Sequence, residues 1–184
     1  MDVQSCLEQL STSRRILVLG SSGSGKSTLA RCLARILDIP LIHLDAHFWQ
    51  PGWVPTAEPA WRARVASLAG GESWIMDGTY ERSLDLRIPA ADTILVVEST
   101  RWSCFWRVLK RKITIDDSNR PDAPPGQPLD LAFLRYVWQY PAVTRPLVYR
   151  LIREHGLHAK LIVLKSPRDV RRFARCTALT EKTR

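Results

Sequence analysis

The chain has 184 residues, of which 45% are hydrophobic and 24% charged, and it carries a formal net charge of +9 at pH 7. This length suits one domain with a sizeable core, and the composition is that of an ordinary globular protein. No apolar run approaches the roughly 20 residues of a membrane span, and residues 1–15 do not resemble a secretory signal. We therefore expect a cytoplasmic protein with no membrane partner. The scattered cysteines, without a C-x-x-C pair, argue against a zinc ribbon or a disulfide framework.

The positive charge has two candidate explanations. Clustered Lys and Arg residues neutralise phosphates in nucleic-acid-binding proteins. Enzymes that transfer phosphoryl groups also concentrate arginines, around developing negative charge. The excess lies in residues 101–112, 120–153 and 168–184. The first two ranges suit catalytic arginines, whereas the third resembles an exposed helix face.

Five short apolar runs are expected to form strands. They cover residues 15–20, 40–44, 73–77, 92–97 and 160–164. Their continuous apolar character is typical of a parallel sheet covered on both faces. Between them apolar residues recur at helical spacing, for example at Trp61, Val65 and Leu68. This alternation predicts a doubly wound α/β layer structure.

Two segments interrupt the alternation. Residues 45–58 are rich in Pro and Trp, and residues 113–128 contain four prolines and one glycine. Each is expected to form a lobe or a lid rather than part of the core. Beyond the second segment, we expect two helices separated by prolines, at 129–140 and 146–156, with Gly156 as a C-terminal cap.

Residues 20–28, GSSGSGKST, lie between the first expected strand and an expected helix. They match the phosphate-loop pattern G-x-x-x-x-G-K-[ST], and these flanks disfavour the alternative of a flexible linker. Backbone N–H groups of such a loop surround a phosphate, the Lys26 ammonium reaches the β and γ phosphates, and the Ser27 hydroxyl ligates Mg²⁺. We predict nucleotide contacts from Gly20, Ser22, Gly23, Ser24, Gly25, Lys26, Ser27 and Thr28.

Two aspartates close expected strands. Asp77 ends the third and precedes Gly78, a position from which a carboxylate can point into the ligand crevice and hold Mg²⁺. The alternative is an aspartate that caps the next turn. Asp45 closes the second strand and is expected to orient Mg²⁺ or to accept a proton from an acceptor. The alternation of His43, Asp45 and His47 does not predict a zinc site, because no second cluster of ligands completes it.

Arg107 and Arg111 share one face of an expected helix that leads into the proline-rich segment. The opposite face is expected to carry an apolar stripe of Trp102, Phe105, Trp106 and Leu109. We predict that the two arginines act on the transferring phosphate; the alternative is a solvated basic face. Weaker candidates for the same role are Arg120, Arg135 and Arg145.

Trp49 and Trp53 lie in the motif FWQPGW. Their rings could stack on a base or form the wall of an acceptor pocket. They could equally form the small core of a lobe, since Trp serves either role at low conformational cost. Both interpretations remain open at this point.

Seven segments carry a resemblance to a known family, in this order: GSSGSGKST, HLDAHFWQPGW, WIMDGTYERSLDLRIPAADTILVVE, RWSCFWRVLKRK, RPDAPPG, FLRYVWQYP and LIVLKSPRDV. Together they resemble the adenylate-kinase-related P-loop proteins often labelled DNA topology modulation proteins, from about residue 14 to residue 174. The resemblance implies a three-layer α/β fold of the P-loop nucleoside-kinase type with a five-stranded parallel sheet. It implies one domain, 1–184, with an acceptor lobe at about 45–70 and a lid at about 112–146.

The resemblance also implies ATP and Mg²⁺ as cofactors. In such kinases the aspartate matching Asp77 assists Mg²⁺, and the arginine matching Arg82 holds the phosphate of the acceptor. The arginines matching Arg107 and Arg111 contact the donor nucleotide, and the loop containing Ser166 lies near the donor base. Residues 79–81 make the segment before Arg82 one residue longer than in adenylate kinases. The acceptor pocket is therefore not an AMP pocket by pattern.

Three functions are compatible with these observations. The first is a magnesium-dependent enzyme that transfers the γ phosphate of ATP to a small acceptor such as a nucleotide. The second is a nucleic-acid-associated regulator switched by nucleotide binding, although no groove-reading motif supports it. The third is a small-molecule kinase with a non-nucleotide acceptor and Asp45 as base.

Overall fold

A parallel sheet forms the centre of the molecule. The computed structural model describes residues 10, 12–114, 128–166 and 168–171, and within them the sheet has five strands in the order β2-β5-β1-β6-β7. The strands are β1 (Arg15–Gly20), β2 (Leu41–His43), β5 (Trp74–Asp77), β6 (Thr93–Val97) and β7 (Lys160–Leu164). The five strands predicted from apolar runs are therefore confirmed, with ends that differ by at most one residue.

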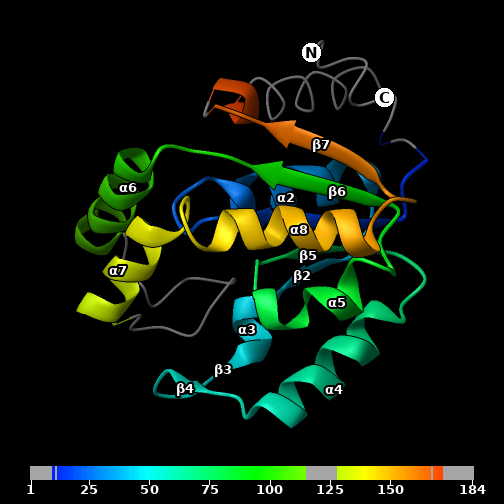
Figure 1. Ribbon diagram of the computed structural model, residues 1–184, viewed down its shortest axis with the longest axis horizontal. Helices are drawn as coiled ribbons and strands as arrows, with labels where there is room; N and C mark the ends of the chain where they lie inside the picture. Colours follow the sequence, from blue (N-terminus) through cyan, green and yellow to red (C-terminus); the bar gives the residue numbers. More distant parts are fainter. Residues whose placement is uncertain (1–9, 11, 115–127, 167, 172–184) are drawn as a thin grey trace.

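Helices cover both faces of the sheet (Figure 1). They are α2 (Lys26–Leu37), α3 (Leu44–Phe48), α4 (Glu58–Ala69), α5 (Leu84–Arg87), α6 (Arg101–Thr114), α7 (Leu131–Gln139) and α8 (Thr144–His155), with the short 3-10 helix η1 (Glu81–Ser83) before α5. None of these helices is long and apolar enough to cross a membrane.

The side chains of β1 alternate between the two faces, which creates two buried cores. Ile16 and Val18 pack in one cluster with Leu29 of α2. Leu17 and Leu19 belong to the other cluster, which includes residues of α4, α5 and α8. Because β1 is covered on both faces, it reads as the continuous apolar run seen in the sequence.

The segment between β2 and α4 forms a small lobe. After α3 the chain makes an antiparallel hairpin of β3 (Trp49–Gln50) and β4 (Val54–Pro55). Leu44, Trp61 and Val65 form a separate small core under it. The predicted lobe thus contains a short helix and a two-stranded hairpin.

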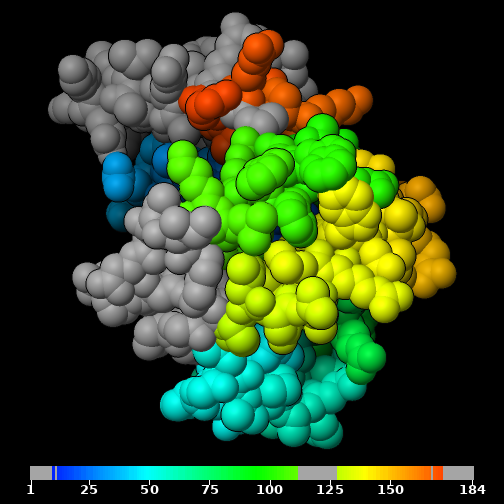
Figure 2. All heavy atoms as spheres, turned by 90° about the vertical axis from the view of Figure 1, so that its left-hand side faces the viewer, coloured from blue at the N-terminus to red at the C-terminus, as the bar shows by residue number. Residues whose placement is uncertain are grey.

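Helices α6 and α7 lie together at the carboxyl ends of the strands, the side that faces the viewer in Figure 2. They pack through Cys104, Val108 and Val137. The predicted apolar stripe of α6 is not its buried face, since Trp102 and Trp106 are 59% and 64% exposed. Residues 115–127, a large part of the predicted lid, lie outside the described residues, as does Arg120.

Helix α8 begins two residues earlier than predicted, at Thr144. Pro146 therefore lies in its first turn, where a missing N–H costs little. Gly156 caps its carboxyl end, as predicted. The helix lies across the sheet with Val148 and Ile152 buried, and α7 precedes it at the edge where the strands end.

Candidate active site

The turn between β1 and α2 has the left-handed glycines and the adjoining helix that a phosphate loop requires. Gly25 has φ of 100° and precedes the first residue of α2. Gly23 has φ of 78°, and a Cβ there would lie 2.5 Å from the carbonyl oxygen of Cys104. Only glycine fits both requirements at Gly23, because the loop is in the left-handed region and touches α6. The loop thus places backbone N–H groups at the positive end of α2, an arrangement suited to an anion.

Asp77 lies beside this loop, at the end of β5. Its neighbour in the adjacent strand is His43, whose Nδ1 lies 3.0 Å from Oδ2 of Asp77. Burial disfavours the charged carboxylate, but the Lys26 ammonium, the hydrogen bond from His43 and the nearby Ser27 hydroxyl outweigh this effect and lower the pKa of Asp77. Asp77 is therefore an anion at neutral pH, directed at the phosphate loop.

The oxygens around Asp77 fit a magnesium ion. Its Oδ1 atom is buried and has no hydrogen-bond partner among the described residues, and the Ser27 hydroxyl is close by. Mg²⁺ prefers oxygen ligands and is usually held by one or two protein groups together with phosphates and water. Ser27 and Asp77, the two predicted ligands, offer such a set.

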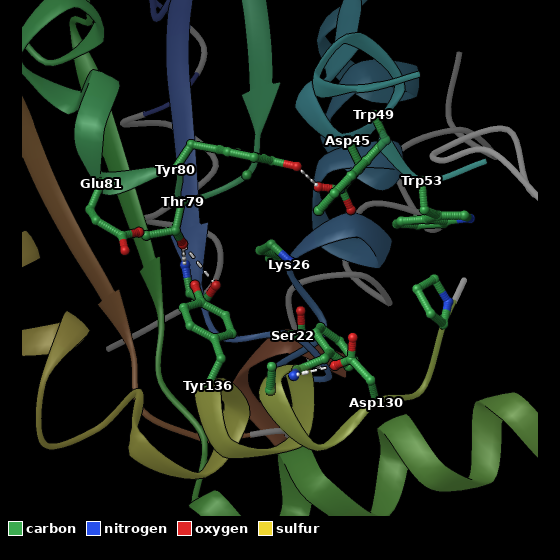
Figure 3. Close-up of a pocket in the computed structure, with 15 residues that line it drawn as sticks. Ser22, Lys26, Asp45, Trp49, Trp53, Thr79, Tyr80, Glu81, Asp130 and Tyr136 are labelled. Carbon is green, nitrogen blue, oxygen red and sulfur yellow. Dashed lines mark hydrogen bonds between the residues drawn. The ribbon is translucent and has the colours of Figure 1, made fainter. Parts of the chain in front are cut away.

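A cavity of about 370 Å³ opens beside the phosphate loop. It is lined by Gly20, Ser22, Lys26, Asp45, Trp49, Trp53, Gly78, Thr79, Tyr80, Glu81, Pro128, Asp130, Ala132, Phe133 and Tyr136. Figure 3 shows Lys26 near its centre, with the lobe side chains on one side and those of α7 on the other. The cavity therefore connects the phosphate-binding loop to the lobe.

Asp45 lies in this cavity, although not where the sequence placed it. It is the second residue of α3 rather than the end of a strand. The hydroxyl of Tyr80 donates a 2.6 Å hydrogen bond to Oδ1 of Asp45 (Figure 3). Burial and the Asp45 charge raise the pKa of Tyr80, so that this tyrosine stays a donor. The bond fixes the Asp45 carboxylate at the wall of the cavity.

Trp49 and Trp53 line the cavity on the lobe side. Their ring centroids are 5.2 Å apart, and the planes are tilted by 46°. The buried core of the lobe is formed by other residues, Leu44, Trp61 and Val65. Of the two interpretations of these tryptophans, the structure favours the pocket wall.

Arg107 lies against the phosphate loop. Its Nη1 donates to the carbonyl oxygens of Gly23 and Ser24, at 3.2 and 3.5 Å. Arg111 follows one turn later on α6 and is partly buried. The structure thus brings Arg107 to the loop, through its backbone carbonyls, and places Arg111 nearer to the end of the helix.

Three other predicted site residues lie outside the cavity. Arg82 is 79% exposed and forms an ion pair with Glu58, at 3.1 Å. Thr28 is exposed in the first turn of α2. Ser166 follows β7, and its hydroxyl accepts a hydrogen bond from the Asp169 amide at 3.1 Å. Two further candidates are on the surface or paired: Arg135 is exposed, and Arg145 lies 3.8 Å from Glu98.

A buried arginine, Arg87, is the main residue that the sequence did not indicate. It is 0% exposed and donates hydrogen bonds to the carbonyl oxygens of Gly78, Thr79 and Tyr80. Burial lowers the pKa of Arg87 to about 9, so that the guanidinium remains charged at neutral pH. It holds the loop that carries Thr79, Tyr80 and Glu81 into the cavity.

Sequence patterns give little warning of these contacts. Arg87 lies in an unremarkable segment, LDLR, whose burial depends on packing from α8 and the sheet. The contact between His43 and Asp77 follows from the pairing of β2 with β5. Knowledge of that strand order would have placed the two side chains next to each other.

No family model matches the chain. Solved structures match most of it, among them shikimate kinase from Acinetobacter baumannii in complex with shikimate, at 16% identity over 96% of this chain and 97% of that one, with a TM-score of 0.53. Shikimate kinase from Bacteroides thetaiotaomicron matches at 16% identity over 92% of this chain and 99% of that one, with a TM-score of 0.56. A sugar kinase from Janibacter sp. HTCC2649 matches at 17% identity over 92% of this chain and 95% of that one, with a TM-score of 0.50.

These similarities establish the fold. The chain has the three-layer α/β fold of P-loop kinases, with a five-stranded parallel sheet, as the sequence predicted. The identities are too low to extend the likeness beyond the fold. The narrower resemblance to proteins labelled DNA topology modulation proteins stays a prediction.

Proposed function

We propose that this protein is an ATP-dependent phosphotransferase that acts on a small molecule with a hydroxyl group. The observation that carries the proposal is the cavity that joins Lys26 to Asp45. A triphosphate on the loop and an acceptor beside Asp45 would meet within it. The kinase fold supports the same assignment, since the matching structures include shikimate kinase and a sugar kinase.

The residues take distinct roles in the proposed transfer. Lys26 and the loop amides position the γ phosphate. Arg107 stabilises the loop through its hydrogen bond to the Gly23 carbonyl and adds positive charge near the phosphate. Ser27 and Asp77 would hold Mg²⁺, which neutralises phosphate charge. Arg111 and Ser166 are proposed to contact the donor nucleotide, the latter near its base.

Asp45 is proposed to act on the acceptor. The acceptor oxygen forms a bond to the γ phosphorus while the bond from that phosphorus to the β,γ-bridging oxygen breaks, and ADP leaves with the electron pair. The proton of the acceptor hydroxyl passes to the Asp45 carboxylate, which Tyr80 holds in place. No covalent enzyme intermediate is needed.

We also propose that two segments of the chain form an acceptor lobe and a lid. Residues 45–70 form the acceptor lobe, because they contribute Asp45 and both tryptophans to the cavity. The segment 112–146 acts as the lid, and its residues on α7 already line the cavity opposite the lobe. Both assignments put the acceptor in the cavity, between the lobe and the residues of α7 that line it.

Lys26→Met tests the proposal. We expect transfer of the γ phosphate to fall by at least about 10³-fold, with an unchanged far-UV circular dichroism spectrum, because the ammonium contacts the transferring group. Lys160→Met is the matched control, since Lys160 begins β7 at the opposite end of the sheet. Transfer is measured as ADP formation with a panel of hydroxylated acceptors. Undiminished transfer by Lys26→Met would show that the loop is not the active site.

A further inference from the structure

The charges that line the cavity are mostly negative. Asp45, Glu81 and Asp130 contribute carboxylates, and Lys26 is the one basic side chain among the described residues that line it. Lys26 lies at the phosphate loop and is assigned to the triphosphate in the proposed function. The acceptor side therefore has three carboxylates in its lining, and the described residues that line it include no arginine.

Within the described part of the chain, Arg82 does not change that balance. Arg82 follows Glu81 directly, but its guanidinium is 79% exposed and pairs with Glu58. It lines a second hollow, which shares Tyr80 and Glu81 with the cavity. The guanidinium of Arg82, which the resemblance assigns to the phosphate of an acceptor, thus pairs with Glu58 and is not part of the cavity lining.

Two of the carboxylates are fixed by hydrogen bonds that favour their charged form. Tyr80 donates to Asp45 at 2.6 Å, and the amide of Phe133 donates to Asp130 at 2.7 Å. The negative field reaches a nearby phenol as well: burial, followed by the charge of Glu81, raises the pKa of Tyr136 well above its ordinary value. An anion placed here would meet the same repulsion.

The remaining walls are aromatic. They are formed by Trp49, Trp53, Tyr80, Phe133 and Tyr136. Aromatic faces bind the apolar faces of rings, and they attract cations through the ring quadrupole. Carboxylates and aromatic faces together form a site suited to an amine cation.

We propose that the acceptor is an alcohol without an anionic group, and that an acceptor bearing a protonated amine is preferred. The amine lies near Glu81 and the aromatic walls, while the hydroxyl lies between Asp45 and Lys26. This inference rests on the proposed function and names its substrate class. It separates this site from one for nucleoside monophosphates or sugar acids.

Matched acceptors test the inference. One set is glucosamine, glucose and glucuronate; the other is 5′-amino-5′-deoxyadenosine, adenosine and AMP. We expect kcat/KM for MgATP-dependent phosphorylation, measured by mass spectrometry, to fall from the cationic to the neutral to the anionic member, with at least tenfold between the extremes. An anionic member that reacts as well as its cationic partner would overturn the inference, and so would the absence of any reaction or binding in both sets.

The variant Glu81→Gln tests whether the cavity causes the preference for cationic acceptors. We expect the ratio of kcat/KM between cationic and neutral acceptors to fall about threefold or more, because one carboxylate is lost. Glu154→Gln is the control, since Glu154 is on the surface of α8 and pairs with Arg150. An unchanged ratio in Glu81→Gln, with native circular dichroism, would overturn the assignment.

Titration of MgATP by calorimetry distinguishes a failure of the proposed function from a failure of the proposed acceptor class. Wild-type protein that binds no MgATP would contradict the proposed function itself. Protein that binds MgATP but prefers anionic acceptors would leave the phosphotransferase assignment intact and overturn only the acceptor class.

Discussion

The two ends of the cavity are built in different ways. The phosphate end is made by backbone from one continuous segment, residues 20–28, and its geometry depends on glycines. The acceptor end is made by side chains from three separate parts of the chain: the lobe, the loop 78–81 and α7. The first can be read from a local pattern, whereas the second exists only once distant segments have packed. The difference predicts that mutations at the phosphate end weaken MgATP binding, whereas mutations at the acceptor end change the kinetics of the acceptor.

Gly23→Ala should have the largest effect and act on the phosphate end. Its Cβ would meet the Cys104 carbonyl oxygen at 2.5 Å, in addition to the strain at φ of 78°. We expect about 3 kcal/mol lower free energy of unfolding in urea and at least tenfold weaker MgATP binding.

Gly52→Ala isolates the contact from the strain. Gly52 has the same φ of 78°, but a Cβ at this position would have no other atom within 4 Å. We expect a loss of only about 1 kcal/mol and unchanged MgATP binding. Equal losses in the two variants would contradict the role of the Cys104 contact.

Arg87→Met should act on the acceptor end. It removes the donor that holds the carbonyls of Gly78, Thr79 and Tyr80, and leaves them buried without that partner. We expect about 3 kcal/mol lower stability. The KM for the acceptor should rise more than the KM for ATP, because the loop carries Tyr80 and Glu81. Arg64→Met, an exposed change on α4, should alter stability by less than about 0.5 kcal/mol.

Tyr80→Phe should have the smallest effect. It removes the hydroxyl that orients Asp45, and we expect kcat/KM for the acceptor to fall about fivefold, with MgATP binding unchanged. Tyr149→Phe removes the same kind of bond outside the cavity, where Tyr149 donates to Glu98 at 3.0 Å. If both variants lost activity equally, the bond to Asp45 would have no special role.

The sequence was informative where the interactions are local. The five strands follow from apolar runs, most clearly β1, β5 and β6, because strands buried on both faces have few polar positions. The phosphate loop follows from residues 20–28, since glycine spacing and the adjacent helix fix its backbone. Gly156 also ends α8 as predicted, although its φ of -120° is not left-handed and a Cβ there would lie 2.9 Å from Ile88 and 3.2 Å from Ile94, so that packing also favours glycine.

The sequence was less informative where tertiary packing decides. The apolar stripe of α6 does not show which face of the helix is buried, because Trp102 packs edge-on against Trp138 at the surface, while Cys104 lies against the phosphate loop. Asp45 was expected to end a strand, but α3 begins before it. The burial of Arg87 could not be predicted, because its partners are backbone carbonyls and no sequence pattern marks them.

Asp45→Asn tests most directly whether the cavity unites donor and acceptor. The central claim predicts that transfer to the best acceptor, measured by mass spectrometry in a single turnover with MgATP, falls by at least about 10²-fold. The dissociation constant for MgATP, measured by calorimetry, should stay within about twofold. Wild-type transfer by Asp45→Asn would contradict the account, because the acceptor hydroxyl would then not react beside this carboxylate.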